Sequence, residues 1–144
     1  MLYMIGGSPC SGKSTIASLL AQQYRLLHIK LDDLVDEMMD QAKASAKPIS
    51  LLRQDRSPNQ IWLRSPEEIA DEEWRFYEEI FPYVTSYLIE HQEQPLLLEG
   101  AGLLPHLVKG LEEPAVSYLC LTPVADFQKK HYRQREWGAG QNFS

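Results

Sequence analysis

The sequence predicts an α/β fold in which a parallel sheet carries helices on both faces. Short apolar runs alternate with segments whose apolar residues recur at helical spacing, an alternation typical of βαβ units. Glycine-rich and acidic motifs follow directly after these apolar runs, and ligands of parallel sheets bind beyond the carboxyl ends of the strands. We expect a single domain over residues 1–144, because this length is too short for two ordinary domains.

Four short apolar runs are the predicted strands. They are bounded by glycine, proline or acidic residues and are short, which favours buried parallel strands over helices. In chain order they cover residues 2–5, 26–31, 96–98 and 115–121. We expect the third run, which ends at Glu99-Gly100, to lie beside the first. The fourth run should leave an under-covered sheet edge, which favours self-association into a homo-oligomer.

Segments with helical apolar spacing separate the strands. They are expected at residues 16–24, 34–42, 66–91, 103–109 and, as the last, 123–137. The first has its apolar face at Ile16, Leu19, Leu20 and Tyr24. The third begins with Ser65-Pro66-Glu67-Glu68, which combines a capping serine, a first-turn proline and acidic residues near the positive helix end. Pro82 should kink this helix or divide it in two.

Residues 43–66 interrupt the alternation of strands and helices. They are rich in Ser, Pro, Arg, Gln and Asn and have weak periodicity, so we expect a long excursion on the substrate side of the domain. Its arginines, Arg53, Arg56 and Arg64, could hold an anionic substrate, and we assign Arg64 to the substrate site.

The most specific motif is a glycine loop after the first predicted strand. Gly7-Ser8-Pro9-Cys10-Ser11-Gly12-Lys13-Ser14 matches the pattern G-x-x-x-x-G-K-[ST]. Its glycines allow backbone N–H groups to form an anion nest, and the next helix points its positive end at the same place. We expect residues 7–15 to bind ATP. Lys13 would neutralise the β and γ phosphates, Ser14 would coordinate Mg²⁺, and Thr15 would add a hydroxyl near the α phosphate.

With this motif, the sequence resembles the P-loop small-molecule kinases, in particular the chloramphenicol phosphotransferase and shikimate kinase group. The likeness covers residues 2–40 well and residues 96–102 and 127–135 loosely. It implies the three-layer P-loop NTPase fold, here without the last strand and helix that such kinases carry. It also implies a carboxylate at the end of the second strand that binds the acceptor hydroxyl and acts as its base. Asp32 matches that position best.

Carboxylates after the predicted strands fit phosphoryl transfer, which depends mainly on positioning and charge stabilisation. A carboxylate near the transferred group can hold the attacking hydroxyl and accept its proton, and Asp32 is our candidate. Asp33 is assigned to the substrate side, with helix capping or solvation as its alternative. Glu99 ends the third strand, a position from which a carboxylate can reach Mg²⁺ through water. Its side chain is longer than that of the aspartate usual at this position, so Glu99 could also contact the substrate. Gly100 would let the backbone approach the ligand.

Arg133 and Arg135 follow the fourth strand, where such kinases carry a lid, and residues 123–137 are our lid candidate. Lid arginines stabilise the charge that spreads over the transferred phosphoryl oxygens. Residues two apart on one helix do not share a face, so we expect one of the two to reach the phosphates. A solvated charge cluster is the alternative.

The histidines lack metal-ligand spacing, and we interpret them as structural or surface residues. They are His28, His91, His106 and His131.

Composition narrows the classes of function. The formal net charge of -6 argues against a nucleic-acid partner, because phosphate backbones are bound through surplus Lys and Arg. No apolar run approaches the roughly 18 residues of a membrane span, and the first residues lack the basic region of a signal peptide. The two cysteines form no C-x-x-C pair, so we expect reduced thiols in a cytoplasmic protein.

The sequence therefore predicts an ATP-dependent kinase that phosphorylates a small-molecule acceptor. Two alternatives stay open. The first is a nucleoside or nucleotide kinase, with a base pocket built by the helix from Pro66 to His91. The second is a nucleotide-binding module without efficient phosphotransfer.

Overall fold

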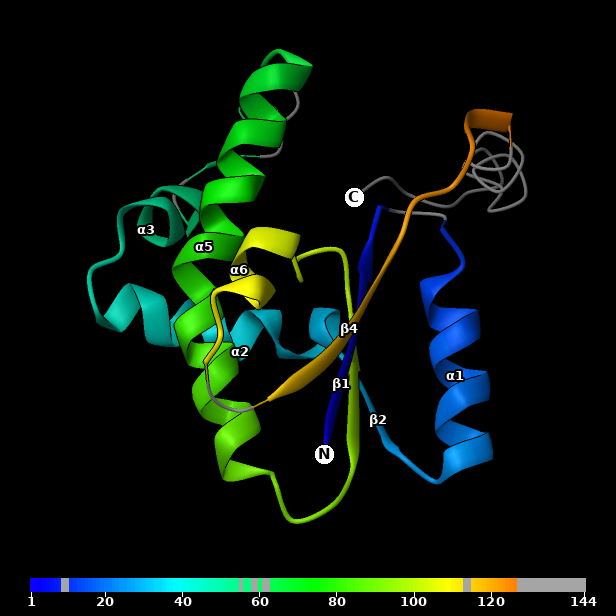
Figure 1. Ribbon diagram of the computed structural model, residues 1–144. Helices are drawn as coiled ribbons and strands as arrows, with labels where there is room; N and C mark the ends of the chain where they lie inside the picture. The colour runs from blue at the N-terminus through cyan, green and yellow to red at the C-terminus, as the bar shows by residue number, and fades with distance from the viewer. Residues whose placement is uncertain (9–10, 55, 58–59, 61–62, 113–114, 127–144) are drawn as a thin grey trace. The chain divides into compact units, whose positions relative to one another are not determined.

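A computed structural model describes residues 1–8, 11–54, 56–57, 60, 63–112 and 115–126 (Figure 1). The chain divides into two compact units. We call Met1–Lys30 together with the chain from Pro95 onward the sheet unit, and Leu31–Gln94 the helical unit. Four predicted site residues lie outside the described residues, together with most of the lid candidate. They are Pro9, Cys10, Arg133 and Arg135.

Four parallel strands form the core of the sheet unit. They are β1 (Leu2–Gly7), β2 (Leu27–Lys30), β3 (Leu96–Glu99) and β4 (Val116–Leu121), in the spatial order β2-β3-β1-β4. Every pairing is parallel, and β3 is buried along its whole length, as an apolar central strand should be. The predicted α/β fold with a parallel sheet is confirmed. Glu99 lies opposite Ile5, so the third strand does neighbour the strand before the glycine loop.

Helices cover both faces of this sheet. α1 (Lys13–Tyr24) lies on one face and α6 (Pro105–Lys109) on the other (Figure 1). α1 buries Ala17 and Ala21, which join Ile5 and Leu97 in one apolar cluster. The predicted apolar face of α1 is partly wrong, because Leu19 and Tyr24 are each 61% exposed. Small residues line the buried face because they let the helix approach the strands closely.

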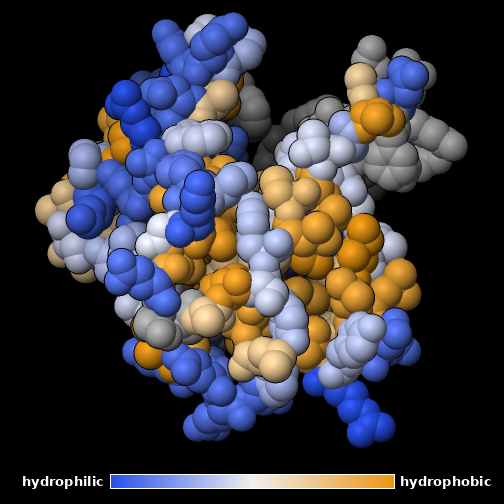
Figure 2. Space-filling view, viewed as in Figure 1, coloured by the Kyte–Doolittle hydropathy of each residue, from blue (hydrophilic) through white to orange (hydrophobic). Residues whose placement is uncertain are grey.

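Among the strands that the structure describes, β4 lies at an edge of the sheet, as predicted, and Leu119 on it is 47% exposed. Figure 2 shows apolar side chains gathered beside β4 and α1. They surround an apolar pocket of about 510 Å³, lined among others by Tyr3, Leu20 and Leu119. The pocket lies in the space that α1 leaves open on its face of the sheet.

Two glycines allow β1 to pack closely on its neighbours. A Cβ atom on Gly7 would collide with the backbone of Leu121, and one on Gly6 would collide with Leu103 O and the Tyr118 hydroxyl. Gly7 also has φ 135, a backbone angle that L residues rarely adopt. The end of β1, where the glycine loop begins, therefore depends on glycine.

We expect Gly7→Ala to lower the free energy of unfolding by about 3 kcal/mol, because it combines overpacking with backbone strain. Urea unfolding followed by circular dichroism measures this change. Gly110→Ala is the control, because its Cβ would make only ordinary contacts, at 3.5 Å from His106 O and Leu107 O. The control should stay within about 0.5 kcal/mol of the wild type. Equal stability of the two variants would contradict the prediction.

The helical unit consists of α2 (Leu31–Ala44), α3 (Pro48–Gln54) and α5 (Pro66–Glu90). α5 begins as predicted, with Ser65 Oγ accepting a hydrogen bond from Glu68 N at 3.2 Å. The helix continues through Pro82, so of the two predicted alternatives the division in two is wrong, and the kink stays a prediction. The buried apolar side chains lie on both sides of the proline. Their packing offsets the cost of the backbone hydrogen bond that is missing because proline has no N–H. They are Phe76, Ile80, Phe81, Val84 and Leu88.

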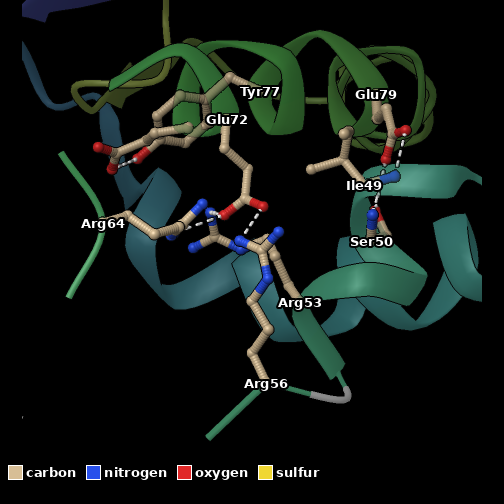
Figure 3. A network of polar contacts seen from close by, with 9 residues as sticks. Ile49, Ser50, Arg53, Arg56, Arg64, Glu72, Tyr77 and Glu79 are labelled. Carbon is tan, nitrogen blue, oxygen red and sulfur yellow. Dashed lines mark hydrogen bonds and ion pairs between the residues drawn. The ribbon is translucent and has the colours of Figure 1, made fainter. Parts of the chain in front are cut away.

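α3 corrects the prediction that residues 43–66 form a long loop, because Pro48–Gln54 is helical. The Glu79 carboxylate on α5 accepts hydrogen bonds from Ile49 N at 2.8 Å, Ser50 N at 2.9 Å and Ser50 Oγ at 2.9 Å (Figure 3). These bonds satisfy backbone donors at the amino end of α3 and place a negative charge at the positive end of its dipole. The cap comes from a distant residue, so local periodicity did not reveal the helix. Among the residues described, no helix is long and apolar enough to span a membrane.

Candidate functional site

The glycine loop joins β1 to α1 in the sheet unit. Gly12 directly precedes α1 in a left-handed conformation, with φ 86 and ψ 11. A Cβ atom there would meet nothing within 4 Å, so the backbone angle, and not crowding, favours glycine. Gly12 O accepts the first helical hydrogen bond, from Ile16 N at 3.0 Å. The strand before the motif and the helix after it are therefore both present.

Two polar side chains of the glycine loop, those of Lys13 and Ser11, bear on ligand binding. Lys13 Nζ donates a hydrogen bond to Ser8 O at 2.9 Å, so the ammonium group lies across the loop. Ser11 Oγ is buried and has no hydrogen-bond partner within the described part of the chain. A buried hydroxyl without a partner costs about 1–3 kcal/mol. This hydroxyl therefore fits a loop that receives a polar ligand.

Ser14 and Glu99, the two predicted metal ligands, lie together. Ser14 Oγ donates a hydrogen bond to Glu99 Oε1 at 2.8 Å, which joins the first turn of α1 to the end of β3. Glu99 is only 4% exposed. Hydroxyl and carboxylate oxygens are ligands that Mg²⁺ accepts, and Mg²⁺ usually completes its shell with water and phosphate oxygens. Residues 1–8, 11–54, 56–57, 60, 63–112 and 115–126 contain no group of three or more His, Cys, Asp or Glu that could hold a metal ion.

His28 is a residue of this site that the sequence analysis missed. From β2, its Nε2 lies 3.8 Å from Glu99 Oε1. β2 pairs with β3 so that His28 lies opposite Leu97 and Lys30 opposite Glu99. Side chains two positions apart share a face of the sheet, so His28 and Glu99 share one too. The pairing of β2 with β3 therefore places His28 beside Glu99. The spacing of histidines along the sequence does not indicate this neighbourhood.

Gly100 and Thr15 complete the predicted residues of the sheet unit. Gly100 is buried, and its N–H donates to Ile5 O at 3.0 Å. The Gly100 N–H is thus bonded to β1, and the approach of this backbone to a ligand stays a prediction. Thr15, in the first turn of α1, is exposed.

Asp32 and Asp33 lie in the first turn of α2, in the helical unit, and both are exposed. Acidic side chains there are stabilised by the positive end of the helix dipole. Burial raises the pKa of Tyr77 well above its usual value, and the negative charges of Glu73 and then Asp32 raise it further. The positive charge of the Arg53 guanidinium lowers the pKa of Tyr77. Asp32 therefore shares one electrostatic environment with Tyr77 and Arg53 within the helical unit.

The three arginines of the predicted excursion converge on Glu72 of α5 (Figure 3). Arg64 Nη2 donates to Glu72 Oε2 at 3.0 Å, and Arg53 Nη1 lies 3.9 Å from the same oxygen. Arg56 pairs with Glu72 Oε1. Arg53 also lies over the ring of Phe76, at 4.3 Å from its centroid. These contacts tie the arginines to α5 and give Arg64 a structural partner, while its contact with a substrate stays a prediction.

We expect Glu72→Gln to lower the free energy of unfolding by about 3 kcal/mol, because it removes the charge of the buried carboxylate that pairs with three guanidinium groups. Chemical unfolding of the variant measures the loss. The matched control is Asp71→Asn, the adjacent residue, whose carboxylate makes an exposed ion pair with Arg75 at 3.2 Å. That control should cost at most about 0.5 kcal/mol. Similar losses in both variants would show that the arginine cluster adds no special stability.

Comparisons with known proteins agree with the fold. No family model and no curated protein matches the chain. Among solved structures, the chain is similar to TT1252 from Thermus thermophilus, with 20% sequence identity and a TM-score of 0.55. The match covers 94% of this chain and 72% of that one. At this identity the likeness shows a shared α/β fold and nothing more.

Proposed function

We propose that the protein is an ATP-dependent kinase of the P-loop small-molecule type, which transfers a phosphoryl group to a small acceptor with Mg²⁺ bound to the nucleotide. The observation that carries this proposal is the hydrogen bond from Ser14 Oγ to Glu99 Oε1, at 2.8 Å. It joins the end of a G-x-x-x-x-G-K-[ST] loop to a carboxylate on the adjacent strand. Such a pair can hold the metal of a nucleotide bound by the loop.

The sheet unit supplies the nucleotide-binding groups. Backbone N–H groups of residues 7–15, except Pro9, which has none, and the buried Ser11 hydroxyl would contact the phosphates. Lys13 would exchange its present acceptor, Ser8 O, for β and γ phosphate oxygens. Ser14 would bind the metal directly and Glu99 through water. When bound, Mg²⁺ offsets the negative charge of the phosphates.

Asp32, in the first turn of α2, is our candidate for holding the acceptor. Asp32 would accept a hydrogen bond from the acceptor hydroxyl. As that oxygen bonds to the γ phosphorus, the bond from the γ phosphorus to the leaving oxygen of ADP breaks, and the hydroxyl proton passes to Asp32. Asp33 and Arg64 are further candidates for acceptor contacts. Arg133 and Arg135, outside the described residues, are our candidates for stabilising the transferred group.

An acceptor screen tests this proposal. Release of ADP from ATP would be measured with the purified chain, Mg²⁺ and a panel of sugars, organic acids, nucleosides and antibiotics. The proposal expects ADP release that depends on one class of acceptor. Dependence on a nucleoside or nucleotide would support the nucleotide kinase alternative, and slow release without any acceptor would support a binding module without efficient transfer. Absence of ATP binding would refute all three.

A further inference from the structure

The carboxylate of Glu99 needs more than one contact to be fixed in place. It lies at the carboxyl end of β3, and Oε1 accepts a hydrogen bond from Ser14 Oγ at 2.8 Å. A glutamate side chain has one more rotatable bond than an aspartate. Ser14 itself is exposed in the first turn of α1. A single bond from Ser14 therefore leaves the direction of Oε2, the oxygen that would face a metal-bound water, only partly determined.

His28 is the neighbour that can supply a second contact. Its Nε2 lies 3.8 Å from the same Glu99 Oε1, and the side chains are 20% and 5% exposed, respectively. Nε2 itself is buried and has no hydrogen-bond partner in the part of the chain that the structure describes. A hydrogen bond between nitrogen and oxygen requires about 3.2 Å or less. A small rotation of the Glu99 carboxylate would bring Oε1 within hydrogen-bond distance of His28 Nε2. The bond would remove the cost of leaving the buried Nε2 without a partner.

We propose that His28 is a positioning residue for the metal site: its Nε2–H donates to Glu99 Oε1 and so directs Glu99 Oε2 toward the metal bound by Ser14. This inference rests on the proposed function, because it requires a nucleotide-bound metal at Ser14. His28 touches neither nucleotide nor acceptor in this arrangement. It acts through the direction of Glu99, as second contacts to metal ligands commonly do.

Binding of Mn²⁺ in the presence of saturating ADP tests the role of His28. Mn²⁺ is the probe, and the electron paramagnetic resonance signal of free Mn²⁺ reports its binding to the full chain. His28→Leu removes the donor, whereas His28→Gln can place an N–H near the position of Nε2. We expect His28→Leu to weaken Mn²⁺ binding by roughly 10-fold or more, and His28→Gln to restore it to within about 3-fold of the wild type. ADP affinity in EDTA should be equal in all three proteins.

The outcomes separate this inference from the proposed function. Equal Mn²⁺ affinity in the wild type and His28→Leu would overturn the inference alone, and so would equal losses in the Leu and Gln variants, which would indicate packing. Absence of ADP binding by the wild type would overturn the proposed function and the inference with it. If His28→Leu does not fold, His28→Asn replaces it, because its shorter side chain cannot reach Glu99. His91→Gln, at an exposed histidine of the helical unit, should change none of these values.

Discussion

Lys13→Ala is expected to weaken the binding of ATP·Mg²⁺ at least about 100-fold. The ammonium group lies across the glycine loop, 2.9 Å from Ser8 O, where it would contact the β and γ phosphates. Hydrogen bonds to charged groups contribute about 1.5–3 kcal/mol each, and two such bonds account for a loss of this size. Isothermal titration calorimetry of the wild type and the variant measures the affinity directly.

The fold should survive the loss of Lys13. In the free protein the variant loses the part-buried hydrogen bond from the Lys13 ammonium group to Ser8 O, worth about 1.5 kcal/mol, and the variant should still fold. Lys109→Ala, at an exposed lysine of α6, is the control for removing a positive charge from the sheet unit, and it should bind ATP normally. ATP affinity in Lys13→Ala equal to that of the wild type would remove the basis of the proposed function.

Asp32→Asn is expected to slow phosphoryl transfer by about 1,000-fold, within the range that a general base contributes. ATP affinity should stay within a few fold, because Asp32 is assigned to the acceptor hydroxyl and not to the phosphates of the nucleotide. The amide keeps the size of the side chain but cannot accept the proton of the acceptor hydroxyl. Turnover with the acceptor found by the screen, together with ATP titration, separates the two effects.

Asp36→Asn on the same helix is the matched control for Asp32→Asn. Asp36 is also exposed, but it lies one turn further along α2. Its replacement should leave both turnover and ATP affinity unchanged. Normal turnover in Asp32→Asn would show that the base is assigned to the wrong residue, even if the rest of the proposal holds.

Local patterns predicted the strands and most helices because the forces that form them act between near neighbours. The run Leu96-Leu97-Leu98 becomes the buried strand β3, and Ser65 caps α5. The failures arose where a distant residue decides the structure. α3 depends on the Glu79 carboxylate, and the buried face of α1 uses Ala17 and Ala21 because the strands lie close to it.

The candidate site could likewise be predicted from the sequence only in part. Ser14 and Glu99 could be predicted together, because the carboxyl ends of adjacent parallel strands meet at one edge of the sheet. His28 could not, because its place beside Glu99 depends on which strand β2 pairs with. Arg64 was expected at a substrate, and the structure shows a contact with Glu72 that the sequence did not predict, while the substrate contact stays a prediction. Charge alone does not show whether an arginine faces a ligand or a carboxylate of its own chain.

The apolar pocket beside β4 reaches from the amino ends of the strands to Ile5 and Leu119, and no residue of the described part of the glycine loop lines it. Met1, Leu26 and Pro95, which each precede a strand by one residue, line the pocket, whereas the loop follows Gly7 at the carboxyl end of β1. A compound that entered the pocket would leave the loop accessible to a nucleotide. Hits from a ligand screen therefore fall into two groups, those that excess ADP displaces and those that it leaves bound, and only the first group reports on the loop.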